Sequence, residues 1–116
     1  MNTVALIGNL ATDVDLKELN EGKKLAAFLL AVNRSGKDGE ADFFRITTWD
    51  RQAELCEQYL AKGQPVGVEG RLRSHSWTDD EGKRRTAIEV NAGRVDFLWR
   101  PERKETPSPA EEAAVA

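Results

Sequence analysis

The sequence predicts an all-β fold in which five main strands close into a barrel and one α-helix lies between the third and fourth strands. Strand-forming residues recur in five segments that are separated by polar, glycine-bearing turns. Helical periodicity is found once, in DRQAELCEQYLAKGQP. The turn TDDEGK joins the fourth and fifth strands into a long hairpin.

The first strand is predicted at residues 2–10 and the second at residues 24–33, with a short strand at 14–19 between them. Both long strands carry apolar residues at even and at odd positions. A strand in a small barrel buries only one face in the core. The second apolar face needs another cover, so we expect a subunit interface there.

The third strand, FFRITTW at residues 43–49, has an unusual outer face. If Phe44, Ile46 and Thr48 face the core, the other face carries Phe43, Arg45, Thr47 and Trp49, because successive side chains of a strand point to opposite sides. Large aromatic rings beside an arginine are unexpected on a face that should be solvated.

The single helix follows this strand. Ala53, Cys56 and Leu60 form one apolar stripe, Asp50 is placed to cap the start, and Gly63 to close the end. An amphipathic helix of about three turns among many strands is expected to cover one end of the barrel.

The fourth strand repeats the pattern of the third. In VGVEGRLRSHSW the core positions are Val66, Val68, Gly70 and Leu72, and the other face carries Glu69, Arg71, Arg73, His75 and Trp77. In the fifth strand the apolar parity changes between Val90 and Val95, which predicts a β-bulge near Gly93. Closed all-β chains with five strands include the OB-fold.

The chain is expected to divide into a folded domain, residues 1–100, and a disordered tail, residues 101–116. The tail holds three of the four prolines and no aromatic residue, so it cannot bury a core. It carries two basic and four acidic residues, which leaves −1 of the formal net charge of −3 on the domain. A nearly neutral domain can still bind an anion if its basic residues share one face.

Localisation is expected to be cytoplasmic, without membrane contact. No apolar run approaches the roughly 20 residues of a membrane span. The N-terminus MNTVALIGNL lacks the basic leader and long apolar stretch of a signal peptide. The single cysteine, Cys56, excludes an internal disulfide and a cysteine cluster for a metal. We expect no cofactor.

Aromatic rings interleaved with arginines suit a planar, anionic ligand. Unpaired bases stack on aromatic side chains at about 1–3 kcal/mol per base, and guanidinium groups pair with phosphates. Nothing in the pattern resembles groups that read base edges in a duplex groove, so a single strand is the predicted ligand. The predicted stacking residues are Phe43, Trp49 and Trp77, and the predicted phosphate ligands are Arg34, Arg45, Arg71, Arg73, Lys83, Arg84 and Arg85.

Residues 1 to about 98 resemble the bacterial single-stranded DNA-binding proteins of the homotetrameric OB-fold type. The matching blocks, in family order, are MNTVALIGNLATDVDLKEL, AAFLLAVNR, DFFRITTW, AELCEQYLAKGQPVGVEGRLR and WTDDEGKRRTAIEV. The resemblance implies base stacking at Phe43, Trp49 and Trp77, with Arg45, Arg71 and Arg73 on the same DNA-facing strands. It also implies first strands that pair between subunits, and nucleoid-associated binding of single-stranded DNA with little sequence preference during replication, recombination or repair.

Two departures from the family pattern affect these expectations. The loop RSGKDGEAD lacks the stacking aromatic that the family often has there, so one contact per subunit is lost. The chain ends in EEAAVA rather than in an acidic tip with a terminal proline-phenylalanine. Docking of repair and replication enzymes through such a tip is expected to be absent or weak, as in a short accessory paralogue or a truncated chain.

Enzyme activity is not predicted. The lone His75 has no serine or cysteine nucleophile in a recognisable setting, and GKRRT lacks the upstream glycine loop of a nucleotide site. The acids Asp79, Asp80 and Glu81 are explained by a hairpin turn without a metal. The stripe places Cys56 toward the core, although near a symmetry axis it could form an inter-subunit disulfide.

A second hypothesis is a protein-interaction module, in which an OB barrel uses its aromatic face to bind another protein. Salt separates the two hypotheses. Counterion release makes the affinity for a single strand fall steeply with ionic strength, whereas an apolar protein interface responds much less.

Overall fold

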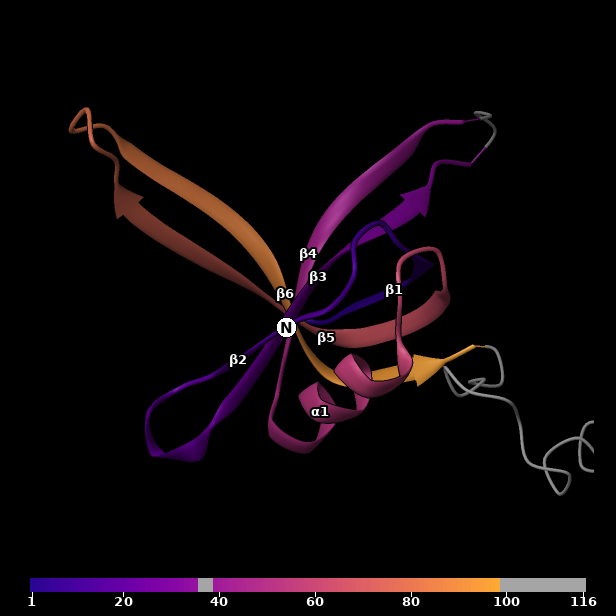
Figure 1. Cartoon of the computed structure of the whole chain (residues 1–116). Coiled ribbons are helices and arrows are strands. Elements are labelled where there is room, and N and C mark those ends of the chain that lie inside the picture. The colour runs from indigo at the N-terminus through magenta and orange to yellow at the C-terminus, as the bar shows by residue number, and fades with distance from the viewer. Residues whose placement is uncertain (36–38, 99–116) are drawn as a thin grey trace, which may run out of the picture.

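The computed structural model describes residues 1–35 and 39–98, and the predicted tail lies outside these ranges. Its elements are β1 (Val4–Leu10), β2 (Asp15–Glu18), η1 (Asn20–Gly22), β3 (Lys24–Asn33), β4 (Ala41–Trp49), α1 (Asp50–Tyr59), β5 (Pro65–Thr78) and β6 (Arg84–Phe97) (Figure 1). β2 is the short strand, so α1 lies between the third and fourth main strands, as predicted.

The strands form one sheet that closes on itself. Its order is β1-β5-β6-β4-β3-β2, and β1 also pairs with β3 through Asn9 and Leu10. The β4–β6 pairing is parallel, while the other strand pairs are antiparallel. This ring of β1, β5, β6, β4 and β3 confirms the predicted all-β, five-stranded OB-fold.

The core fills the ring and is covered at one end by α1. Leu30, Ile46 and Val66 are fully buried among aliphatic neighbours. The predicted helical stripe is confirmed, since Ala53 and Cys56 are 0% exposed and Leu60 is 2% exposed. The expectation that Asp50 caps the helix is wrong, because Trp49 is the N-cap residue and no side chain caps this end. The Asp50 carboxylate instead accepts the backbone N–H of Lys24 at 3.2 Å, so this side chain ties α1 to β3.

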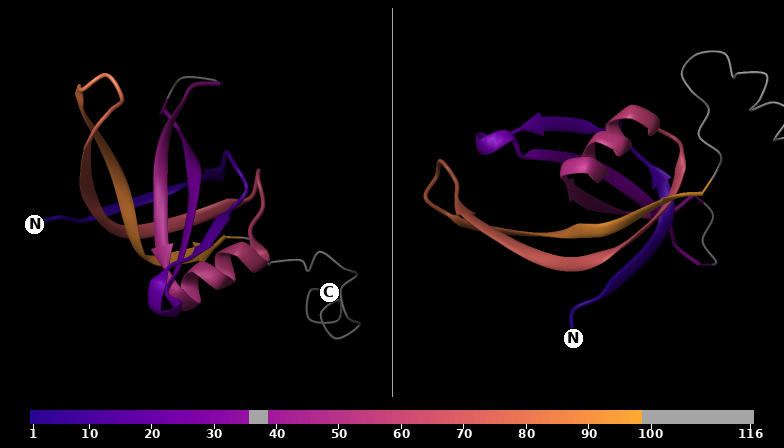
Figure 2. Two further views of the ribbon diagram at one scale, coloured as in Figure 1. Left: turned by 60° about the vertical axis from the view of Figure 1, so that its left-hand side comes forward. Right: turned by 90° about the horizontal axis from the view of Figure 1, so that it is seen from below.

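Two hairpins extend beyond the ring as arms that diverge from each other, β3–β4 and β5–β6 (Figures 1 and 2). The expectation that Leu72 faces the core is wrong, because Leu72 is 44% exposed. The β5–β6 hairpin leaves the ring after Gly70, so both faces of its outer part meet solvent. Ile88, on β6, is 66% exposed for the same reason.

The predicted β-bulge is present where the β5–β6 arm joins the ring. Glu69 pairs with Arg94 but Gly70 pairs with Ala92, which leaves Gly93 as the extra residue. Gly70 is the position that needs a glycine, because an added Cβ would overlap the Asn91 carbonyl oxygen and lie 2.8 Å from Ala92 Cα. The bulge therefore permits a close approach of the two backbones.

Thr47 differs from its neighbours on the outer face of β4, since it is only 4% exposed. Its hydroxyl donates to the Val90 carbonyl oxygen of β6 at 3.4 Å. β6 crosses β4 at this point and covers Thr47, whereas the predicted exposure of the other outer residues is correct. No helix in the described ranges is long and apolar enough to cross a membrane.

Candidate nucleic-acid interface

Strand register places the two aromatic faces on the same side of the sheet. Thr47 of β4 pairs with Asn91 of β6, and Asn91 pairs with Arg71 of β5. Directly paired residues in a sheet point to the same face, and the side-chain period is two. Arg45 and Trp49 therefore share a face with Arg73 and Trp77, although these pairs are distant in the sequence.

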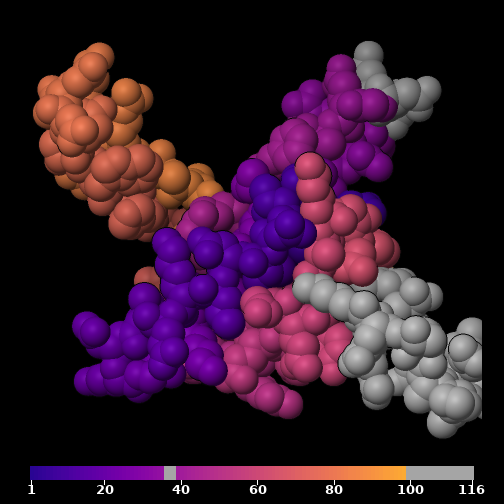
Figure 3. All heavy atoms as spheres, viewed as in Figure 1, coloured from indigo at the N-terminus to yellow at the C-terminus, as the bar shows by residue number. Residues whose placement is uncertain are grey.

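These side chains line a groove of about 430 Å³ where β4 passes the β5–β6 arm. Trp49 is 38% exposed and Trp77 is 44% exposed, so each side chain is partly accessible to solvent. The arms protrude beyond this region and leave an open notch between them (Figure 3). The groove is lined by Leu25, Arg45, Thr47, Trp49, Arg73, His75, Trp77, Ala87, Ile88, Glu89 and Asn91.

The Trp77 ring is held by its neighbour on the same face of β5. The His75 and Trp77 rings are stacked, with centroids 5.4 Å apart and planes inclined by 23°. This contact presents the two rings of β5 together along the arm. An unpaired base can extend such a stack, because every base has a flat aromatic face.

Phe43 lies on the outer face of β4 but beyond this groove. It is 62% exposed and pairs with Ala31 of β3, toward the β3–β4 arm. Arg71 lies in an adjoining hollow that Arg73 and Asn91 share with the main groove. The predicted stacking residues thus share one face of the sheet but do not all line one groove.

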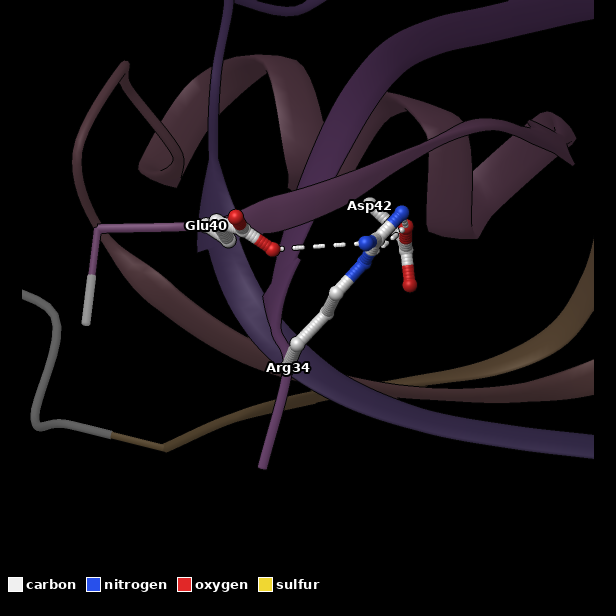
Figure 4. A network of polar contacts seen from close by, with 3 residues as sticks. All are labelled: Arg34, Glu40 and Asp42. Atoms are coloured by element: carbon white, nitrogen blue, oxygen red, sulfur yellow. Dashed lines mark hydrogen bonds and ion pairs between the residues drawn. The ribbon is translucent and has the colours of Figure 1, made fainter. Parts of the chain in front are cut away.

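Three of the predicted phosphate ligands already pair with carboxylates. Arg34, at the base of the β3–β4 loop, donates from Nε to Asp42 Oδ1 at 2.9 Å and from Nη1 to Glu40 Oε2 at 3.3 Å (Figure 4). The hydrogen bond that Arg34 donates to Asp42 is the main reason that the pKa of Arg34 lies above its ordinary value.

At the tip of the other arm, Arg85 Nε donates to Asp79 Oδ2 at 2.8 Å. Asp79 Oδ1 also accepts the backbone N–H groups of Glu81 and Lys83, at 3.0 and 2.9 Å. The Arg85 hydrogen bond, followed by these backbone contacts, lowers the pKa of Asp79. The Asp79 carboxylate therefore organises the turn as well as holding the arginine.

In the groove itself, Arg45 Nε donates to Glu89 Oε2 at 3.2 Å. By contrast, Arg71, Arg73, Lys83 and Arg84 make no ion pair within residues 1–35 and 39–98. Arg84 pairs with Thr78, one step along from the Trp77–Arg85 pair, so Arg84 lies on the opposite face of the arm. The other three cations extend along the arm from its base to its tip.

Sequence reasoning did not single out five residues that line the groove, which are Leu25, Ala87, Ile88, Glu89 and Asn91. Leu25 pairs with Trp49 and lines the groove. One residue of the second apolar face of β3 is therefore part of the groove wall. Asn91 borders the main groove and two adjoining hollows. Glu89 pairs with Arg73 across the β5–β6 hairpin. This pairing could have been predicted from the sequence by counting residues outward from the TDDEGK turn.

The other candidate chemistry is not assembled. Cys56 is fully buried, and burial raises the pKa of its thiol to about 12. A buried thiol cannot meet its copy in another subunit, so the structure offers no route to the inter-subunit disulfide. Within the described residues, no three His, Cys, Asp or Glu side chains gather in a way that could hold a metal.

Comparison with known proteins agrees with this arrangement. Residues 1–98 match the model of the Single-strand binding protein family. Similar proteins include the single-stranded DNA-binding protein of Treponema pallidum (strain Nichols), 42% identical over 103 residues, which are 84% of this chain and 58% of that protein.

Two further relatives give the same result. Single-stranded DNA-binding protein A of Bacillus subtilis (strain 168) is 40% identical over 102 residues, 84% of this chain and 59% of that protein. The single-stranded DNA-binding protein of Halalkalibacterium halodurans is 42% identical over 102 residues, 84% of this chain and 61% of that protein. The chain thus spans about three fifths of the length of these curated relatives. The family match and the extent of identity show that the chain belongs to the single-strand binding protein family.

Proposed function

We propose that this protein binds single-stranded DNA with little sequence preference. The observation that carries the proposal is the groove in which Trp49 and Trp77 are both part-exposed, with Arg45 and Arg73 between them. Flat rings supply stacking for any base, and guanidinium groups pair with the phosphates of the backbone. The names of the relatives, single-stranded DNA-binding proteins, support the same ligand.

The chemistry of the groove favours a single strand over a duplex. Stacking on Trp49 or Trp77 requires a base whose face is free, and the bases of a duplex are stacked on each other. Phe43 and Trp49 are six residues apart on β4, about 20 Å at roughly 3.3 Å per residue, and such a span suits several nucleotides. The proposed phosphate ligands are Arg34, Arg45, Arg71, Arg73, Lys83 and Arg85 along this path, and Arg84 on the opposite face of the β5–β6 arm.

We also propose that the protein assembles as a homotetramer, with β1 at a subunit interface. β1 pairs with β3 only at Asn9 and Leu10, so the edge of residues 4–8 that faces away from β5 has no strand partner in the described chain. Such an edge is suited to pairing with another strand. On the adjoining face, Ile7 is 70% exposed and Leu98 is 47% exposed, which leaves apolar surface to be covered.

In the cell, this activity would protect strands that are exposed in replication, recombination or repair. The protein acts in the cytoplasm, on the nucleoid, without catalysing a reaction. The groove supports this role because its contacts are with parts of DNA that all sequences share.

The proposal is tested by fluorescence anisotropy with labelled oligo-dT, repeated from 50 to about 300 mM NaCl. We expect log Kd to rise steeply with log salt, by about 0.7 for each phosphate that is neutralised. A duplex of the same length should compete poorly. If the protein binds no oligonucleotide, or only with a flat salt response, the aromatic face is better explained as a surface for a protein partner.

A further inference from the structure

The Glu89 carboxylate lies in the groove and pairs with Arg45, one of the proposed phosphate ligands. Its carboxylate accepts a hydrogen bond from Arg45 Nε at 3.2 Å, and its backbone pairs with Arg73 across the β5–β6 ladder. It is the one acidic side chain among the residues that line the groove. An anion that approaches Arg45 and Arg73 therefore meets a carboxylate that is already there.

The contacts of Glu89 do not suggest a structural role. Arg45 is the one hydrogen-bond partner of its side chain within the described ranges. Asp79, by contrast, accepts two backbone N–H groups besides Arg85 and so holds its turn together. The Glu89 side chain is 27% exposed and the Arg45 side chain 55% exposed, so the pair is open to exchange with a ligand.

We propose that Glu89 is an internal competitor for the DNA backbone, which holds Arg45 in the empty groove and is replaced by a phosphate when DNA binds. This inference rests on the proposed function and adds a residue that sets its affinity. A guanidinium pairs with either a carboxylate or a phosphate, so the exchange keeps Arg45 paired in both states. The cost is the repulsion between the displaced carboxylate and the incoming phosphate.

The exchange has a measurable consequence for binding. A phosphate at Arg45 also faces the negative charge of Glu89. Arg45 therefore contributes less binding free energy than an arginine that has no carboxylate beside it. Removing the charge should tighten binding by at least about fivefold at low salt, because two unit charges about 4 Å apart interact by about 1 kcal/mol even in bulk water. It should also make the salt dependence steeper, by about 0.7 in the slope of log Kd against log salt.

The test is the variant Glu89→Gln in the full chain, with labelled oligo-dT as the probe. Glutamine has nearly the same size and can still accept a hydrogen bond from Arg45. The matched control is Glu57→Gln, which removes the same charge from an exposed position on α1 that makes no ion pair within the described ranges. We expect the control to bind within about twofold of the unmodified protein.

A double-mutant cycle separates exchange at Arg45 from a general field effect. In an Arg45→Met background, Glu89→Gln should lower log Kd by half or less of the amount by which it lowers log Kd in the otherwise unmodified protein. An equal gain in both backgrounds would overturn the proposed exchange. Circular dichroism checks the fold, and Glu89→Thr, a residue suited to strands, repeats the measurement if the glutamine variant is unstable.

The outcomes for this inference and for the proposed function are distinct. If the unmodified protein binds oligo-dT and neither Glu89 variant binds more tightly, Glu89 is no competitor, while single-strand binding stands. If the unmodified protein binds no single strand, the proposed function fails and this inference fails with it. Tighter binding that is confined to the Glu89 variants and depends on Arg45 supports both.

Discussion

Thr47 of β4 and Asn91 of β6 are paired across the parallel junction of the sheet, and the Thr47 hydroxyl donates to the neighbouring Val90 carbonyl oxygen. This pairing fixes where β4 lies against the β5–β6 arm. Trp49, two residues beyond Thr47, is thereby placed in the same groove as Trp77. The candidate site thus depends on a junction in the sheet more than on any single loop.

The close approach of backbones at the bulge predicts that Gly70→Ala destabilises the fold. The added Cβ would overlap the Asn91 carbonyl oxygen, and overpacking of this kind costs about 1–3 kcal/mol. Chemical denaturation at a fixed protein concentration measures the loss. Gly93→Ala is the control, because a Cβ at the bulged residue itself meets nothing within 4 Å. Equal stability of the two variants would contradict this explanation of the bulge.

Burial predicts that Cys56 is unreactive in the folded protein. Because its thiol is fully buried and its pKa is raised to about 12, almost no thiolate is present or accessible near pH 8. We expect a colourimetric thiol reagent to modify Cys56 only after unfolding in guanidinium chloride. Rapid modification of the native protein, or a covalent dimer under oxidising conditions, would show that α1 opens readily.

The Asp79–Arg85 pair predicts a local dependence on pH. Since Arg85 and the turn N–H groups lower the pKa of folded Asp79, the pair stabilises the hairpin tip fully above the ordinary carboxyl pKa of about 4. That contribution is lost as pH falls through the lower, folded value. An NMR titration of the Asp79 carboxyl group measures this.

Arg85→Ala is the matched variant for that titration, because the Arg85 hydrogen bond is the largest cause of the shift. We expect it to move the Asp79 midpoint upward, toward the value of an unperturbed carboxyl group. A midpoint that does not move would mean that the ion pair is not maintained in solution.

The free edge and apolar face of β1 predict that Ile7→Asp breaks the assembly. Sedimentation of the unmodified protein should give about four times the chain mass of 12.9 kDa, and the variant a smaller species. Leu19→Asp is the control, since Leu19 is also exposed, at 41%, but lies before η1 rather than on β1. A tetrameric Ile7→Asp variant would place the interface elsewhere, and a monomeric unmodified protein would contradict the proposed assembly.

Local patterns were sufficient to predict most of the fold. The period of two placed the outer residues of β4 and β5, and the change of parity between Val90 and Val95 located the bulge at Gly93. The error at Leu72 arose because parity does not say where a hairpin leaves the barrel. Beyond that point neither face is covered, and a core position becomes exposed.

The candidate site was predicted less completely than the fold. The aromatic and basic residues of each strand could be recognised separately, but their partners come from other strands. Glu89, Asp79 and Asp42 neutralise Arg45, Arg85 and Arg34 across hairpins or across the β4–β6 junction. The charges along one strand do not reveal such ion pairs, because the register between strands decides which residues face each other.

The most direct test of the account is quenching of tryptophan fluorescence by unlabelled oligo-dT. Stacked bases should quench Trp49 and Trp77, so each of Trp49→Ala and Trp77→Ala should reduce the quenching and weaken binding by about 1–3 kcal/mol, with the folded circular dichroism spectrum retained. If the folded protein shows no quenching at saturating oligo-dT, or if both variants bind as tightly as the unmodified protein, the groove is not a stacking surface for bases.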